Sequence, residues 1–239
     1  IRRCQSFLQW GDPDNDFLVI LPVKEMWKKD TRHPLMLFDI HSMDKKAPEL
    51  IRAIHEIDSL GYDCDYISER QLARAKKVGE QWITEAGTRY RGLIDPTKPI
   101  DSQALARLAN AEPMRTQLHL RAIRRRNGMG YHYFIANLTP NDVDSYVPLA
   151  VAWHDALWYD PLTGRRYAVE QRNRQLHVAL RSGESMILQT FDRTLPQTLA
   201  ALPHRALPGD QTKVLGGPWQ LAFEQSAPTV RRTWKLDKP

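Results

Sequence analysis

The chain has 239 residues, of which 42% are hydrophobic and 26% are charged, a composition typical of a globular protein that buries a real core. No apolar run approaches the roughly 18 residues of a membrane-spanning helix, and no signal-peptide pattern is present. The net charge of +6 suits an anionic partner, but a mildly basic fragment of a larger protein is the commoner explanation. The chain starts without Met, in residues 1–5 that resemble the middle of a helix, which indicates an excerpt or a processed product.

The first strong pattern is a strand followed by a helix. The continuous apolar run at residues 17–22 is typical of a buried parallel strand. Residues 44–60 predict a helix, because apolar side chains recur there at helical spacing. Asp44 is its predicted cap, and Pro48 fits its first turn. Gly61 follows at the position where a left-handed residue commonly ends a helix.

Residues 1–112 as a whole predict an α/β fold. Residues 62–67 and 89–95 predict two further short strands, and Asp101 is predicted to cap a later helix. This order of strands and helices implies βαβ crossovers and a sheet with parallel pairs. A complete doubly wound domain needs about 120 to 150 residues, so we expect a partial parallel-sheet domain that is flavodoxin-like or amidotransferase-like.

From about residue 115 the hydrophobic pattern alternates with a period of two. Residues 117–123 and 131–137 alternate on either side of a turn at 127–130, and they predict a hairpin. The other predicted strands form two more hairpins, 156–159 with 165–169 and 176–180 with 185–191. Closely spaced hairpins with Gly or Pro in their turns predict an antiparallel β-sandwich.

The sequence therefore predicts three segments. Residues 1–112 are expected to form the partial α/β domain, and residues 113–194 the β-sandwich domain. Residues 195–239 are expected to hold a linker and the first strands of a further β domain, beginning at residues 215–223.

Common catalytic and metal-binding motifs are missing from the sequence. We find no Walker loop, dinucleotide-binding glycine fingerprint, serine nucleophile elbow or HExxH motif. Cys4 and Cys64 are too few for a disulfide framework and lack metal-ligand spacing, so we interpret them as free, buried thiols. Cys64 also lacks the flanking glycines of an amidotransferase nucleophile.

One polar cluster is a candidate for ligand contact. Asp39, His41 and Asp44 follow an apolar segment, and loops that leave the carboxyl ends of strands form the ligand sites of α/β sheets. A cap-and-turn role is the commonest one for such residues, ahead of ligand contact and catalysis. We name Asp39 and His41 as the substrate-proximal candidates, and no residue as catalytic or metal-binding.

Three other features have both a functional and a structural interpretation. Asp63 and Asp65 resemble a carboxylate pair, but Asp at strand ends is routine. The basic run at residues 121–126 resembles a nucleic-acid site, but one solvated strand face is the simpler interpretation. Trp153, Trp158 and Trp219 suit a carbohydrate platform, although sandwich cores also use Trp.

Several longer strings occur in an order that resembles one known family. They span nearly the whole chain, at residues 1–11, 16–27, 39–43, 61–68, 124–128, 133–137, 158–164 and 215–223. Together they resemble the part of glycoside hydrolase family 106, the α-L-rhamnosidase family, that follows the catalytic barrel.

The resemblance implies a role in the breakdown of plant polysaccharides. Members of this family are large, multi-domain and usually exported, which implies a periplasmic or extracellular location. Two glutamates on their barrel hydrolyse rhamnosides with inversion, one as general acid and one as general base, with calcium near the sugar. No Glu of this chain lies in a matching motif, so catalysis and calcium are expected only in the full-length protein.

The leading hypothesis is an accessory, non-catalytic segment whose partners are the barrel of the same polypeptide and its carbohydrate substrate. One alternative is a carbohydrate-binding module that uses exposed Trp and Tyr. A weaker alternative is a basic nucleic-acid-binding domain, which rests only on charge. Neither a nucleic-acid partner nor a membrane span is part of the leading hypothesis.

Overall fold

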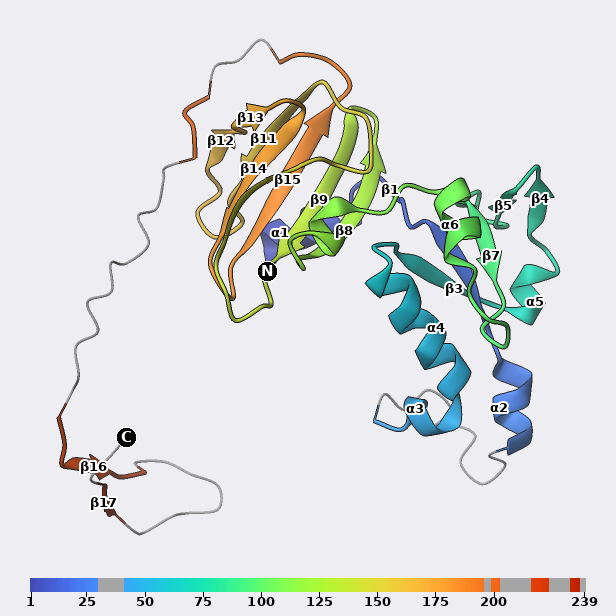
Figure 1. The fold of residues 1–239 in the computed structure, drawn as a ribbon, viewed down its shortest axis with the longest axis horizontal. Coiled ribbons are helices and arrows are strands. Elements are labelled where there is room, and N and C mark those ends of the chain that lie inside the picture. Colours follow the sequence, from blue (N-terminus) through green and yellow to red (C-terminus); the bar gives the residue numbers. More distant parts are fainter. Residues whose placement is uncertain (30–40, 196–198, 203–215, 224–232, 237–239) are drawn as a thin grey trace. The chain divides into compact units, whose positions relative to one another are not determined.

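The computed structural model describes residues 1–29, 41–195, 199–202, 216–223 and 233–236 (Figure 1). It divides the chain into two compact units, Ile1–Leu202 and Pro203–Pro239. The first unit contains helices, a small parallel sheet and several antiparallel sheets, which confirms an α/β region followed by a mainly β region. The boundaries at residues 112 and 194 remain predictions.

The parallel sheet has β2 (Phe17–Leu21) at its centre, between β3 (Cys64–Ser68) and β7 (Gly92–Ile94). Both neighbours run parallel to β2. Phe17, Leu18 and Val19 are at most 1% exposed, because apolar side chains cover both faces of the central strand. The predicted buried parallel strand is therefore confirmed.

The helix predicted at residues 44–60 is divided in two. α3 (Met43–Lys46) ends at Ala47, and α4 (Pro48–Ser59) begins directly after it. The break has a local cause, because Pro48 disfavours helical backbone at the residue before it, and Ala47 has a φ of −142°. Asp44 lies in the first turn of α3 and does not cap it, since Ser42 is the N-cap residue.

α4 packs on the parallel sheet through the face that the sequence predicted. Leu50, Ala53 and Ile57 are its buried side chains, and Leu50 and Ile57 join the core that contains Phe17. Gly61 follows with a φ of +87°, which confirms the predicted left-handed end of the helix.

The other elements of this region are short. They are the helices α2 (Val23–Lys29), α5 (Glu69–Leu72), α6 (Ser102–Leu108) and α7 (Pro113–Thr116), and the strands β4 (Lys76–Val78), β5 (Gln81–Ile83) and β6 (Arg89–Tyr90). The sheet β4-β5-β6 was not predicted, because its strands of two or three residues are too short for a periodic pattern. Asp101 caps α6 as predicted, since its Oδ1 accepts from the backbone N–H groups of Gln103 and Ala104.

The β region consists of two antiparallel sheets. The larger contains β1 (Asp12–Pro13), β8 (Arg121–Asn127), β9 (Gly130–Ala136), β15 (Ser185–Phe191), β11 (Asp155–Tyr159) and β12 (Arg166–Ala168), in that order. The smaller contains β10 (Val143–Val147), β14 (Gln175–Leu180) and β13 (Gln171–Arg172), in that order. Side chains from both sheets form one core, which includes Tyr133, Ile135, Trp158, Leu176 and Leu188. The predicted β-sandwich architecture is confirmed.

The sheet pairing corrects two details of the sequence analysis. β14 and β15 were predicted to form one hairpin, but β14 pairs with β10 and β13, whereas β15 pairs with β9 and β11. The connection from β14 to β15 crosses from one sheet of the sandwich to the other. The burial patterns of the two strands are the same as those of hairpin strands, so the sequence could not show this. In addition, β8 begins at Arg121 rather than at residue 117, because α7 and a left-handed His119 (φ 54°) precede it.

The first residues of the chain pack on the β region. α1 (Arg2–Gln9) confirms the predicted helix, and β1 pairs with β8. The ring of Trp10 stacks on that of His132, with centroids 5.0 Å apart. Gly11 has a φ of +68°, and an added Cβ would lie 2.1 Å from the carbonyl oxygen of Arg126, so only glycine fits this turn.

The second unit is described at β16 (Trp219–Leu221) and β17 (Trp234–Leu236), which pair in antiparallel fashion. β16 falls within the strand predicted at residues 215–223. Among the helices of the described residues, none combines the length and the apolar character required to span a membrane.

Candidate functional site

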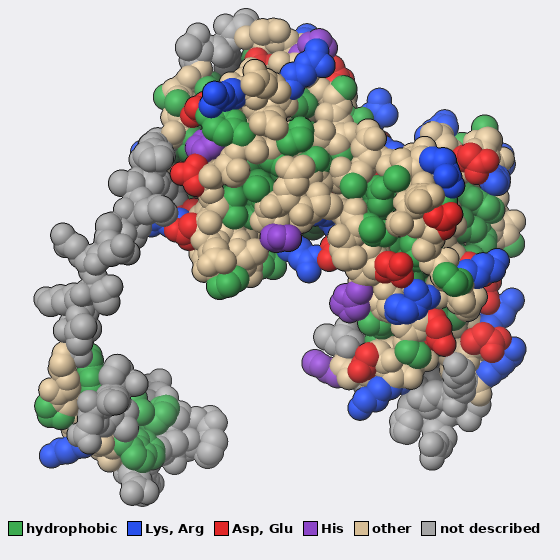
Figure 2. Space-filling view, viewed as in Figure 1, with side chains coloured by type: hydrophobic (Ala, Val, Ile, Leu, Met, Phe, Trp, Pro, Cys, Tyr) green, Lys and Arg blue, Asp and Glu red, His purple; other side chains and the backbone are tan. Residues whose placement is uncertain are grey.

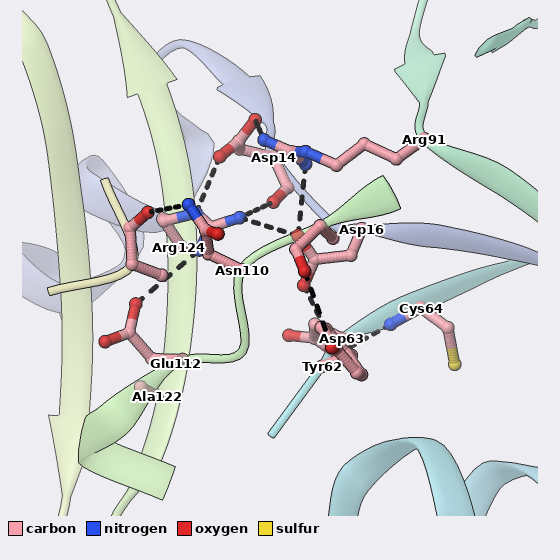
Figure 3. A network of polar contacts seen from close by, with 12 residues as sticks. Asp14, Asp16, Tyr62, Asp63, Cys64, Arg91, Asn110, Glu112, Ala122 and Arg124 are labelled. Carbon is pink, nitrogen blue, oxygen red and sulfur yellow. Dashed lines mark hydrogen bonds and ion pairs between the residues drawn. The ribbon is translucent and has the colours of Figure 1, made fainter. Parts of the chain in front are cut away.

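The most concentrated group of charged side chains surrounds Arg124 on β8 (Figure 3). Its Nε donates to Asp14 Oδ2 at 2.6 Å, and its Nη2 donates to Asp16 Oδ1 at 3.0 Å. Its Nη1 lies 3.5 Å from Glu112 Oε2. The Arg124 side chain is only 8% exposed, so this guanidinium is buried among three carboxylates.

Asp16 connects this group to the parallel sheet. It precedes β2 and is 3% exposed, and its Oδ2 accepts from the backbone N–H of Asp63 at 3.1 Å. Its Oδ1 also accepts from Arg91 Nη1, at 3.1 Å. Asp16, Asp63 and Arg91 lie just before β2, β3 and β7, respectively. The network therefore lies at the amino-terminal edge of the parallel sheet.

Arg115 makes a second connection beside the first. Its Nη1 donates to Asp58 Oδ1 at 3.0 Å, and its Nη2 donates to Asp63 Oδ2 at 2.7 Å. The same guanidinium donates to the carbonyl oxygens of Tyr62 and Ala122. Since Ala122 belongs to β8, Arg115 links α4 and the residues just before β3 to the first long strand of the β region.

Burial decides the electrostatics of this network. Burial alone would lower the pKa of Arg124, but Tyr133, Asp16 and Asp14 raise it well above its ordinary value. The pKa of Glu112 is raised by burial, against the opposing effect of Arg124. Burial likewise raises the pKa of Asp63, which Arg115 opposes. Burial therefore outweighs the guanidinium groups at Glu112 and Asp63, and the guanidinium groups limit how far the pKa of each carboxylate rises.

The space inside the network is too small for a substrate. A cavity of about 10 Å³ lies among Asp14, Asp16, Glu112, Arg124 and Tyr133, which is about the room that one water molecule needs. A second cavity, of about 150 Å³, adjoins Asp16, Arg91 and Arg124 and is still smaller than the roughly 300 Å³ at which small-molecule sites begin. A general acid or base must reach the proton of a bound substrate. These carboxylates contact guanidinium groups instead, so the arrangement suits the joining of two regions rather than proton transfer.

The structure shows only part of the substrate-proximal pair named from the sequence. Asp39 lies outside the described residues. His41 is exposed, in a turn just before α3, on the connection from β2 to α4. This connection leaves the carboxyl end of β2, opposite to the Arg124 network, and its proximity to a substrate stays a prediction. Within the described residues, no group of three His, Cys, Asp or Glu side chains is placed to hold a metal ion.

Asp63 and Asp65 have separate structural partners. Asp63 pairs with Arg115, whereas Asp65 Oδ2 accepts from the hydroxyl of Tyr90 at 2.7 Å. Between them, Cys64 has a pKa raised to about 12, mainly by burial and by the charge of Asp63. Its thiol is therefore protonated at neutral pH and is a poor nucleophile. The strand-end role favoured for both aspartates agrees with these contacts.

Comparison with known proteins gives a distant structural likeness. No family model and no curated protein matches this chain. A rhamnosidase from Novosphingobium sp. PP1Y has a solved structure that is similar to this chain, with a TM-score of 0.41 and 16% sequence identity. The similarity covers 74% of this chain and 24% of the rhamnosidase, so the chain spans about a quarter of that protein's length.

The basic run at residues 121–126 was interpreted as a solvated face, and this is wrong for Arg124. Arg121 is exposed and pairs with Asp58, whereas Arg124 points inward with Ala122. The two-residue alternation of Ala122 and Arg124 was the signal that could have shown this. On the surface seen in Figure 2, basic and acidic side chains are interspersed within the first unit and do not form a continuous basic stripe.

Proposed function

We propose that this chain is an accessory, non-catalytic segment of a large α-L-rhamnosidase-like glycoside hydrolase that acts on plant polysaccharide. The observation that carries the proposal is the buried network of Arg124 with Asp14, Asp16 and Glu112. It joins the α/β and β regions into one rigid support, because separating them would leave buried charges without their partners. Carboxylates that form ion pairs with a buried guanidinium stabilise the fold and are not available to a substrate.

The sequence supports the family assignment. Strings that resemble the rhamnosidase family occur in family order along nearly the whole chain, and they match the part that follows the catalytic barrel. The proposed partners are this barrel, in the same polypeptide, and its carbohydrate substrate. By the same resemblance we propose a periplasmic or extracellular location for the parent protein, with any calcium bound by the barrel.

The first test is an activity assay. We expect the purified chain to leave aryl α-L-rhamnosides intact, at rates equal to a blank without protein. Turnover well above the blank that is lost when a carboxylate of this chain is replaced, with Asp63→Asn and Asp65→Asn as the first variants, would contradict the proposal.

The second test uses the complete reading frame that contains Ile1. We expect it to encode a catalytic barrel upstream, and deletion of residues 1–202 should lower the Tm of that barrel. Aryl rhamnosides should still be hydrolysed by any folded remainder, because the catalytic pair lies in the barrel. A reading frame without a barrel would exclude the proposed function.

We further propose that His41 lies near the substrate cleft of the full-length enzyme without acting as acid or base. In that enzyme, His41→Ala should lower kcat/KM by about 1 to 2 kcal/mol, or roughly 5- to 30-fold, as for one lost hydrogen bond. A loss of about 10²- to 10⁴-fold together with a changed pH profile would make His41 catalytic instead. An unchanged kcat/KM would make it an ordinary surface residue.

A further inference from the structure

A cavity lies at one end of the β region, and its lining shares no residue with the Arg124 network. Its volume is about 570 Å³, within the range of about 300 to 1,000 Å³ that small-molecule sites occupy. Its walls are the loop Pro148–His154, which joins β10 to β11, and the hairpin between β13 and β14. The cavity is therefore large enough for a ligand, unlike the space around Arg124.

The lining combines an apolar wall with a few polar groups. Leu149, Val151 and Trp153 pack partly against the sandwich core and present their remaining surface to the cavity. The polar side chains of the lining are His154, Gln171 and Arg174. An apolar wall with a small number of convergent polar groups is the usual composition of a ligand site.

Both walls are held by the sheet framework. The backbone N–H of His154 donates to the carbonyl oxygen of Phe191 at 2.9 Å, which ties the end of the loop to β15. On the other side, Arg172 pairs with Gln175 in the β13–β14 ladder, so the turn between them has only two residues. The cavity is thus preformed rather than dependent on a closing segment.

The turn places Arg174 where the fold by itself would favour glycine. Asn173 and Arg174 have φ values of 52° and 61°, as in a type I′ hairpin turn. Asn is common at the first central position of this turn, but the second is dominated by glycine, because a Cβ is strained there. Strained residues concentrate at functional sites, and Arg174 is one of the residues that line the cavity.

The charge of the lining indicates the ligand. Among the described residues that line the cavity, Arg174 is a fixed positive charge and none is a carboxylate. A guanidinium binds a carboxylate through two parallel hydrogen bonds. Phosphate is commonly bound at a helix N-terminus, and no helix in the described part of the chain contributes to this lining.

We propose that this cavity binds a sugar acid. The carboxylate of a uronic acid would pair with Arg174, and its ring would lie against Trp153, with hydroxyl groups toward Gln171 and His154. A saccharide fits both parts of the lining, because its ring has apolar C–H faces and a polar edge. The inference goes beyond the proposed function and does not rest on it, since it uses only the residues of this cavity.

Binding to the full 239-residue chain would test the proposal by titration followed with calorimetry or NMR. The probes are D-galacturonate and D-glucuronate, with D-galactose, acetate and inorganic phosphate as controls. At least one uronate should bind with a Kd on the order of 1 mM, and all three controls about tenfold more weakly or less. If neither uronate bound at concentrations on the order of 10 mM, or if galactose, acetate or phosphate bound as well as a uronate, the sugar-acid assignment would be wrong.

Two variants of the same turn separate binding from folding. Arg174→Gly should weaken uronate binding about 10- to 100-fold, the effect of a lost hydrogen-bonded charge, while the protein stays at least as stable as wild type. Asn173→Gly changes the neighbouring left-handed residue and should leave binding unchanged. Wild-type affinity in the folded Arg174→Gly protein would overturn the role of Arg174, and equal losses in both variants would attribute the effect to the turn backbone.

Discussion

Two arginines of the β region have opposite surroundings. Arg124 is buried at the centre of β8 and contacts three carboxylates, Asp14, Asp16 and Glu112. Arg174 lies in a hairpin turn beside an open cavity whose described lining contains no carboxylate. The first arginine stabilises the contact between two regions, and the second is placed to contact a ligand.

The difference follows from the cost of removing charge from water. A buried guanidinium is tolerated only with well-placed partners, so the matched charges around Arg124 indicate a structural role. Arg174 keeps access to water and has no such requirement, yet its left-handed backbone is strained. The fold therefore depends on Arg124, whereas it would be better served by glycine at position 174.

The largest effect should follow from replacing Arg124. Arg124→Ala leaves the buried Asp16 and Glu112 and the partly buried Asp14 without their common partner, and we expect a loss of about 3 to 5 kcal/mol in the free energy of unfolding. Urea denaturation measures this loss. The matched control is Arg126→Ala on the exposed part of the same strand, which should change the stability by less than about 0.5 kcal/mol.

If Arg124→Ala lowered the free energy of unfolding by less than about 1 kcal/mol, the contrast between Arg124 and Arg174 would have no basis. It would mean that the three carboxylates find water or other partners when the guanidinium is absent. The proposal of a rigid, two-region support would then lose its main observation.

Replacing Arg115 should have a smaller effect of the same sign. Arg115→Ala removes the pairs with Asp58 and Asp63 but leaves the Arg124 network in place, so we expect a loss of about 2 to 3 kcal/mol. Burial raises the pKa of Asp63 and Arg115 opposes this, so the variant should raise the pKa of Asp63 further. Carboxyl NMR titration would detect the change, and an unchanged pKa would show that Arg115 contributes little there.

Arg174→Gly should have the opposite sign. Glycine adopts a positive φ without the steric cost of a Cβ, so the variant should be more stable by about 1 kcal/mol. Thermal unfolding would measure this as a higher Tm. A lower Tm would mean that the Arg174 side chain itself stabilises the fold, and the contrast with Arg124 would disappear.

Glu112 makes the stability of the Arg124 network depend on pH. Its pKa is raised by burial, so in the pH window between the unfolded and folded pKa the folded state binds more protons than the unfolded state. Stability from this group is therefore present at low pH and is lost as the pH rises through the folded pKa.

Glu112→Gln lacks this titration, so the stability of wild type minus that of the variant should fall as the pH rises through the folded pKa of Glu112. Denaturation curves at several pH values would reveal the trend. A difference that grows with pH would show instead that Arg124 outweighs burial and lowers the pKa of Glu112.

Local sequence was sufficient where neighbouring residues decide the structure. The apolar run of β2, the Asp101 cap of α6 and the left-handed Gly61 were each predictable from a few adjacent positions. The same local rules limited the sequence analysis elsewhere. The break at Ala47 follows from Pro48, but helical spacing over residues 44–60 hid it.

The candidate sites were mostly not predictable, because their residues come from distant parts of the chain. Asp14 and Arg124 are separated by 110 positions, and no periodic pattern connects them. The cavity likewise combines the loop at 148–154 with the turn at 173–174, although the Asn-Arg pair of that turn is an unusual feature of the sequence itself. His41, which the sequence did suggest, stays a prediction.

The sequence by itself determined the fold class, since burial periodicity of two or 3.6 residues is a local property of strands and helices. Only the tertiary structure decided which strands share a sheet, and it places β14 and β15 in different sheets. It also decided which arginine is buried, because the same side chain is solvated or desolvated according to what packs above it. For Arg124 that covering comes from Asp14, Asp16 and Glu112, and their approach to β8 depends on the assembly of both regions.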